Sequence, residues 1–268
     1  MKVLTVQDIS CYGQCSTTVA LPVLSSYGHE TVILPSAILS THTGGFSGFT
    51  VLDLTEEMPK IINHWQKENI KFDALYTGYI GDSRQFDYIL DIKDKMMNKN
   101  GLFFVDPAMA DHGKMYYGLG EDIVEGMRRM CRCADYILPN ITEACFLTNT
   151  KYQEKQDDKF INELLEKLYQ LGAKNVILTG CEEGNMLGAI AYNGKDKVKV
   201  MKERQYPSYH GTGDIFSSVI IGNILNNKSL YETLDDATSF IVDSIIATKQ
   251  DKEHGYGVKF EEVLKNKR

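Results

Sequence analysis

The feature that most constrains the fold of this chain is a regular alternation of short β-branched runs with longer amphipathic segments. Strands are predicted over residues 3–9, 31–39, 75–78, 102–105, 136–138 and 176–178. Helices are predicted over residues 17–27, 83–98, 157–171, 213–225 and 230–249. This order is typical of strand-helix-strand units wound into an α/β fold with a mostly parallel central sheet.

The domain organisation follows from what the chain lacks. No linker, internal repeat or low-complexity tract divides it, so we expect one domain over residues 1–268. The segments 186–192 and 198–201 are separated by Asn193-Gly194 and a charged stretch, which predicts a small antiparallel hairpin at one edge of the sheet.

The charge and composition exclude several classes of function. A net charge of −7 and a pI near 5.4 leave no basic surface for a nucleic-acid backbone, so we expect no nucleic-acid partner. The apolar run at the N-terminus is too short for a signal peptide, and no run of apolar residues is long enough to cross a membrane. We therefore expect a cytoplasmic protein whose six cysteines are reduced.

Polar residues follow nearly every predicted strand. In open α/β sheets ligands bind beyond the carboxyl ends of the strands, so these positions are the candidate site. They are Ser10, Thr41, His42, Thr43, Gly44, Gly45, Tyr79, Asp106, Asn140, Thr142, Glu143 and Thr179.

The strongest single motif is His210-Gly211-Thr212-Gly213-Asp214, which leads directly into an apolar helix. Its glycines permit a tight turn, and the start of the helix presents unpaired N–H groups that suit a phosphate. Asp214 could accept the proton of a substrate hydroxyl, or its carboxylate could simply complement the helix dipole. The sequence chemistry leaves both interpretations open.

Two further carboxylates are candidates for a metal. Asp106 and Glu143 each follow a predicted strand, so both could hold Mg²⁺ beside nucleotide phosphates, directly or through water. The alternatives are a strand-end turn at Asp106-Pro107 and helix capping by Thr142 or Glu143. The chain contains no Walker-type phosphate loop and no dinucleotide-binding glycine pattern, which excludes those two binding modes.

Six motifs in order make the chain resemble the pyridoxal kinase family of the ribokinase superfamily over nearly its whole length. They are Gln7-Asp8-Ile9-Ser10 with Tyr12-Gly13, Ser40-Thr41-His42-Thr43-Gly44-Gly45-Phe46, Thr77-Gly78-Tyr79-Ile80-Gly81, Asp106-Pro107-Ala108-Met109, Pro139-Asn140-Ile141-Thr142-Glu143 and Gly211-Thr212-Gly213-Asp214. The resemblance implies a ribokinase-like three-layer α/β/α sandwich.

The resemblance also implies a role for each motif. Asp214 would be the catalytic base, and Gly211, Thr212 and Gly213 would form the anion hole. The pyridine substrate would lie against Ser10, His42, Thr43 and Tyr79. ATP and Mg²⁺ would be held by Asp106, Asn140, Glu143 and Thr179, with Asp106 and Glu143 organising the metal.

The implied reaction is ATP-dependent phosphorylation of the 5'-hydroxymethyl group of pyridoxal, pyridoxine or pyridoxamine by a homodimer. The alternatives are a hydroxymethylpyrimidine kinase of thiamine synthesis and a noncatalytic vitamin B6-binding protein. A requirement for K⁺ and the preference among the three pyridines stay open, because Gly44-Gly45 stands where many relatives carry an amide side chain.

Two glycine-rich segments are expected to move. Gly44, Gly45 and Gly48 would make one loop flexible, and residues 110–120 could fold over the nucleotide and exclude water. Ordinary surface turns are the alternative for both.

Overall fold

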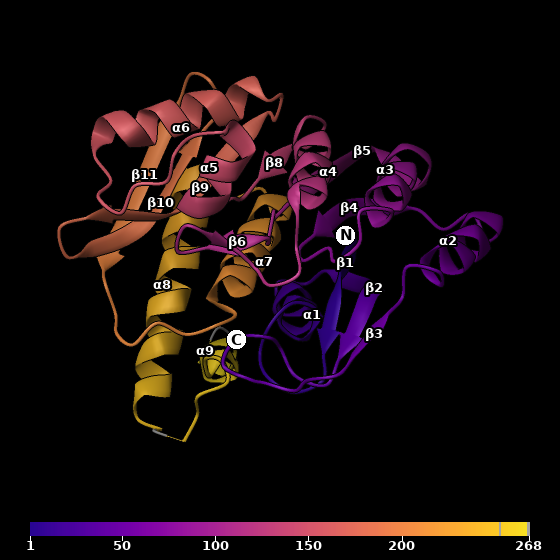
Figure 1. Cartoon of the computed structure of the whole chain (residues 1–268), viewed down its shortest axis with the longest axis horizontal. Helices are drawn as coiled ribbons and strands as arrows, with labels where there is room; N and C mark the ends of the chain where they lie inside the picture. Colours follow the sequence, from indigo (N-terminus) through magenta and orange to yellow (C-terminus); the bar gives the residue numbers. More distant parts are fainter. Residues whose placement is uncertain (252, 267–268) are drawn as a thin grey trace.

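The computed structural model of the protein describes residues 1–251 and 253–266 (Figure 1). The described residues form a nine-stranded sheet of order β11-β10-β9-β8-β5-β4-β1-β2-β3. Its strands are β1 (Lys2–Ser10), β2 (Glu30–Leu39), β3 (Val51–Asp53), β4 (Phe72–Thr77), β5 (Met97–Val105), β8 (Tyr136–Ile137), β9 (Asn175–Glu183), β10 (Met186–Tyr192) and β11 (Lys197–Glu203). A separate two-stranded ribbon joins β6 (Ala110–Asp111) to β7 (Lys114–Met115).

The centre of the sheet is parallel and its two edges are antiparallel. Strands β2, β1, β4, β5, β8 and β9 pair in parallel, whereas β9–β10, β10–β11 and β2–β3 pair antiparallel. The mostly parallel sheet and the predicted hairpin of residues 186–192 and 198–201 are both confirmed. Because parallel strands end at the same edge, the polar residues that follow them gather along that edge.

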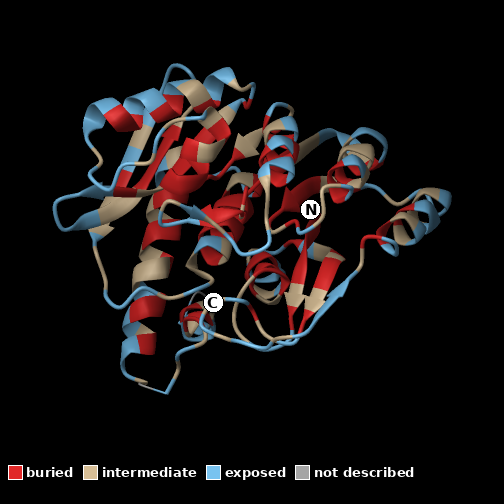
Figure 2. Cartoon of the chain, in the orientation of Figure 1, coloured by how far each residue is buried: buried red, intermediate tan, exposed pale blue. Residues whose placement is uncertain are grey.

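Helices cover both faces of the sheet (Figures 1 and 2). One layer contains α1 (Thr17–Ser26), α7 (Thr212–Leu225), α8 (Leu230–Lys249) and α9 (Phe260–Asn266). The other contains α2 (Met58–Lys67), α3 (Gln85–Met96), α4 (Glu121–Cys131), α5 (Ile141–Thr148) and α6 (Asp158–Gln170). The three-layer α/β/α arrangement is therefore confirmed.

Side-chain alternation along the strands explains why two cores form. Successive residues of a strand point to opposite faces, so a strand buried on both sides needs apolar residues throughout. Val3 packs into the core beneath α1 and α7, while its neighbour Leu4 packs into the core beneath the other helical layer. Phe104 and Phe103 divide in the same way on β5.

Several elements differ from the sequence prediction. The helix predicted over 83–98 ends at Met96, because Met97 already begins β5. Helices α2, α4 and α9 and the strands β3, β6 and β7 were not predicted. Within the described residues no helix combines the length and apolarity needed to cross a bilayer.

Candidate active site

The N-terminus of α7 is built around a glycine that no other residue could replace. Gly211 caps the helix with φ +79°, and a Cβ at this position would lie 1.8 Å from the backbone oxygen of Gln14. Both the left-handed backbone and the close approach therefore require glycine. The rest of α7 is fixed by burial, since Ile215, Val219 and Ile220 are fully inaccessible. The first N–H groups of α7 are thus held rigidly at the carboxyl edge of the sheet.

Asp214 lies in the first turn of α7 and lines a cavity of about 410 Å³. Burial raises the pKa of its carboxyl to about 7, the negative charge of Asp106 adds to the rise, and the backbone amide of Ser16 opposes it. A carboxyl with this pKa can accept a proton near neutral pH, as a general base must.

Asp106 follows β5 and faces the same cavity with only 7% of its surface exposed. Its Oδ2 accepts a hydrogen bond of 2.7 Å from the hydroxyl of Ser217. Burial raises the pKa of Asp106 to about 6, although the bond from Ser217 lowers it. Ser217 lies three residues after Asp214 on α7, so the residue that bonds Asp106 lies on the same helix face as Asp214.

Glu143 stabilises the start of α5 by a capping box with Asn140. The side chain of Asn140 accepts from the amide of Glu143 at 2.9 Å, and Glu143 Oε2 accepts from the amide of Asn140 at 2.8 Å. Its other oxygen accepts from the amide of Met109 at 3.2 Å. The pKa of Glu143 is raised by burial and by the charge of Asp106. The capping alternative is thus realised, with Asn140 in place of Thr142 as the N-cap residue.

The donor set suits Mg²⁺ bound largely through phosphate oxygens. Among the described residues no cluster of three or more His, Cys, Asp or Glu side chains could hold a metal by itself. Mg²⁺ prefers one or two carboxylates together with phosphates and water. Asp106 and Glu143 fit that requirement, and both oxygens of Glu143 accept backbone hydrogen bonds, which favours contact through water over direct ligation.

The cavity unites most of the residues predicted to bind nucleotide and phosphate. Asp106, Asn140, Glu143 and Thr179 line it together with residues 211–214. Thr179 is fixed beside Asn140 by a parallel β-bridge, and its amide donates to the oxygen of Pro139 at 2.9 Å. The segment 110–120 contributes Asp111, His112 and Tyr116 to the wall. The amide of Gly113 also donates to the hydroxyl of Thr142 at 3.0 Å, which ties this segment to α5.

The residues predicted to bind the pyridine form a second group outside the lining of that cavity. Ser10 and His42 are buried, Tyr79 is half-buried and Thr43 is exposed. The Ser10 hydroxyl donates a hydrogen bond of 2.9 Å to Asp8. Asp8 also interacts electrostatically with His42, Tyr79 and Asp214. Asp8 therefore links this group to the proposed base.

The sequence prediction assigned no role to three polar residues near Asp214, which are Asp8, Ser16 and Ser217. Burial raises the pKa of Asp8, and the hydroxyls of Ser16 and Ser10 lower it. Ser16 has φ +51° and contacts Asp8 and Asp214 through its hydroxyl and its amide, respectively. The spacing Asp8-x-Ser10 on a strand and Asp214-x-x-Ser217 on a helix could have indicated Asp8 and Ser217, because each pair shares a face.

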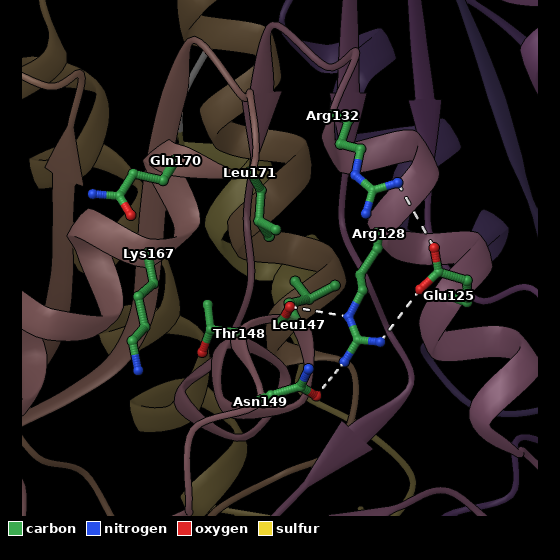
Figure 3. A pocket seen from close by; sticks show the side chains of 9 residues that line it. All are labelled: Glu125, Arg128, Arg132, Leu147, Thr148, Asn149, Lys167, Gln170 and Leu171. Carbon is green, nitrogen blue, oxygen red and sulfur yellow. Dashed lines mark hydrogen bonds and ion pairs between the residues drawn. The ribbon is translucent and has the colours of Figure 1, made fainter.

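A second cavity of about 440 Å³ lies between α4, the end of α5 and α6 (Figure 3). Arg128 lines it on the α4 side and donates to the backbone oxygens of Phe146 and Leu147 and to the side chain of Asn149. Glu125 pairs with both Arg128 and Arg132. The charged groups here are therefore engaged with one another and with the C-terminus of α5.

Comparison with known proteins agrees with the geometry. The sequence profile of the family described as phosphomethylpyrimidine kinase matches residues 21–259. A protein from Bacteroides thetaiotaomicron, provisionally named a phosphomethylpyrimidine kinase and crystallised with pyridoxal, is 39% identical with a TM-score of 0.93 over 99% of this chain and 94% of its own. Pyridoxal kinase from Lactobacillus plantarum is 29% identical with a TM-score of 0.91, over 99% and 95% of the two chains.

A curated relative extends the same comparison. Pyridoxal kinase from Arabidopsis thaliana is 27% identical over 258 residues, which is 92% of this chain and 80% of the relative. The profile match spans most of the chain and includes the carboxylates at Asp106, Glu143 and Asp214. The chain therefore belongs to the phosphomethylpyrimidine kinase family, and its predicted place among the pyridoxal kinases of the ribokinase superfamily is confirmed.

Proposed function

We propose that this protein transfers the γ-phosphoryl group of ATP to the 5'-hydroxymethyl group of pyridoxal, pyridoxine or pyridoxamine. The observation that carries the proposal is Asp214, a carboxyl with a pKa of about 7 in a cavity wall, in the first turn of a rigid helix N-terminus. A base and a set of fixed amides in one place are what transfer to an alcohol requires. The kinase relatives support the same reaction.

In this reaction Asp214 accepts the proton of the substrate hydroxyl while that oxygen attacks the γ-phosphorus. A new O–P bond forms, the bond between the γ-phosphorus and the bridging oxygen breaks, and its electron pair leaves with ADP. The amides at Gly211, Thr212 and Gly213 stabilise the charge on the transferring group without moving. Asn140 and Thr179 hold the nucleotide side of the cavity.

Mg²⁺ would be held by Asp106 and, through water, by Glu143. When bound, it would neutralise charge on the nucleotide phosphates. Ser10, His42, Thr43 and Tyr79 would hold the pyridine, since hydroxyl-bearing and aromatic side chains suit a neutral aromatic alcohol. We place the protein in the cytoplasm as a homodimer. Sedimentation equilibrium tests whether it is a homodimer.

The second candidate substrate is hydroxymethylpyrimidine, which a matching relative named hydroxymethylpyrimidine/phosphomethylpyrimidine kinase favours. The two substrates are distinguished by measuring kcat/KM for each alcohol with saturating Mg-ATP. We expect a higher value for pyridoxal, because the relative crystallised with pyridoxal shares 39% identity with this chain. A higher value for the pyrimidine would reverse the order.

A noncatalytic binding protein is the remaining alternative. It would hold pyridoxal without consuming ATP, so binding of pyridoxal measured by calorimetry must be compared with ADP release from the same sample. Binding without ADP release in the presence of Mg-ATP would contradict the proposed reaction.

A further inference from the structure

His210 lies directly before the anion-binding turn and is a polar residue that the proposed reaction leaves without a role. It lines the same cavity as Gly211, Gly213 and Asp214. Its backbone is fixed on the C-terminal side by Gly211, whose conformation and contact with Gln14 leave no freedom for a larger residue. His210 is exposed, so its imidazole is accessible from the cavity whose wall also contains the amides of that turn.

The loop that contains His42 and Gly44 also restricts the position of the His210 ring. A Cβ on Gly44 would lie 2.5 Å from two atoms of the His210 ring, which is well inside van der Waals contact. The ring also packs against His42 with 5.5 Å between centroids. Gly44 lacks the positive φ that marks other glycines of this chain, so the restriction on a larger residue here is the space that the imidazole occupies.

The charges of the cavity indicate what the imidazole could do. Asp106, Glu143 and Asp214 all lie in its wall, and a phosphate group would add further negative charge. Among the described residues that line the cavity, Lys202 and Arg204 are the Lys and Arg side chains. Lys202 pairs with Asp235 at 2.6 Å, and Arg204 pairs with Glu182 at 2.8 Å. His210 is the cation-capable side chain that adjoins the first turn of α7.

We propose that His210 is a catalytic residue whose imidazole contacts the transferring phosphoryl group beside the Gly211–Gly213 amides and stabilises its charge in the transition state. The inference rests on the proposed kinase reaction and deepens it. A preorganised donor next to developing charge contributes to kcat more than to ground-state binding. Gly44 then leaves free the space that the His210 ring occupies.

The test compares His210→Gln and His210→Ala with His64→Ala, a control on the exposed surface of α2. We expect kcat for pyridoxal to fall about 100- to 1,000-fold in both His210 variants, as for loss of one oxyanion donor, with KM values within about threefold. Imidazole added to the buffer should restore part of the rate of His210→Ala and none of the rate of His64→Ala. A purely structural role would not produce that rescue.

A double-mutant cycle with Gly44→Ala supplies an independent measurement. The added Cβ should displace the imidazole and lower kcat in the wild-type background, but it should cost less than twofold in the His210→Ala background, where the space is free. Thermal unfolding and pyridoxal binding confirm that each variant is folded. If His210→Ala fails to fold, the near-isosteric His210→Gln carries the comparison.

The inference is overturned if a folded His210 variant keeps kcat within twofold of wild type, or if only KM changes. Its failure is distinct from failure of the proposed function, because the latter is seen in the wild-type protein as an absence of turnover. An active wild type with unaffected His210 variants rejects this inference alone.

Discussion

Two cavities of nearly equal volume show how differently this chain uses charge. The cavity at α7 measures about 410 Å³ and holds carboxylates whose pKa values are raised because burial disfavours their ionised forms. The Arg128 cavity measures about 440 Å³, and its charged groups have partners of opposite charge: Glu125 pairs with Arg128 and Arg132, and Lys167 pairs with Glu163. Volume does not distinguish the two. Buried carboxylates without a counter-ion mark the functional cavity. Burying them destabilises the fold, and groups with such perturbed pKa values cluster where proteins bind ligands or catalyse reactions.

The largest expected contrast is in activity. Asp214→Ala should lower kcat at least about 1,000-fold, because the reaction loses the carboxylate that accepts the proton of the substrate hydroxyl. Arg128→Ala, made in the other cavity, should leave kcat within about twofold. Steady-state kinetics at saturating Mg-ATP and pyridoxal measures both variants. Activity of Asp214→Ala within tenfold of wild type would remove Asp214 from the role of base.

The next contrast is in stability and its dependence on pH. The folded-state pKa of Asp214, about 7, exceeds its ordinary value of 3.8, so ionisation opposes folding increasingly as pH rises from about 4 to 7. Asp214→Asn should therefore stabilise the protein above pH 7, by at most about 4 kcal/mol, and have little effect near pH 4.

Arg128→Ala should behave in the opposite way. It removes the side-chain donor to the carbonyls of Phe146 and Leu147 at the end of α5, which should cost about 1–3 kcal/mol at either pH because arginine stays charged. Urea denaturation of both variants at pH 5 and pH 8 measures the two trends. A stability gain for Asp214→Asn that is equal at both pH values would contradict the assigned cause.

A smaller effect is expected at the hydroxyl that holds Asp106. Ser217→Ala removes the 2.7 Å bond to Asp106 and should raise the pKa of that carboxyl further, since the bond favours the ionised form. We expect a three- to tenfold loss of kcat, or about 1 kcal/mol, that is partly recovered at higher pH. Ser218→Ala is the matched control, because that hydroxyl donates to the backbone oxygen of Asp214 and not to a carboxylate of the described residues. Equal losses in both variants would point to a defect of the helix.

The smallest effect concerns Asp8. Its charge raises the pKa of Asp214, so Asp8→Asn should move the acid limb of the kcat profile to lower pH by about half a unit or less. Pyridoxal turnover between pH 5 and 9 measures the shift. Movement of the limb to higher pH would show that the two carboxyls are not coupled as described.

Sequence reasoning predicted the sheet, its parallel centre and the motif at α7, because buried parallel strands are apolar runs that end in polar loops. It missed Ser217, since this residue lies within a helix that is buried along most of its length and gives no amphipathic signal. It could not find the contacts of Gly211 with Gln14 or of Gly44 with His210, because these join segments far apart in the chain. Such contacts depend on tertiary packing and leave no local pattern.

The most direct test of the central claim is to follow wild type and Asp214→Asn by ³¹P NMR with Mg-ATP and pyridoxal. The account predicts that pyridoxal 5'-phosphate and ADP appear in equal amounts with the wild type, and that neither accumulates at a comparable rate with the variant. Release of orthophosphate without a phosphorylated pyridine, or equal product formation by the variant, would contradict it.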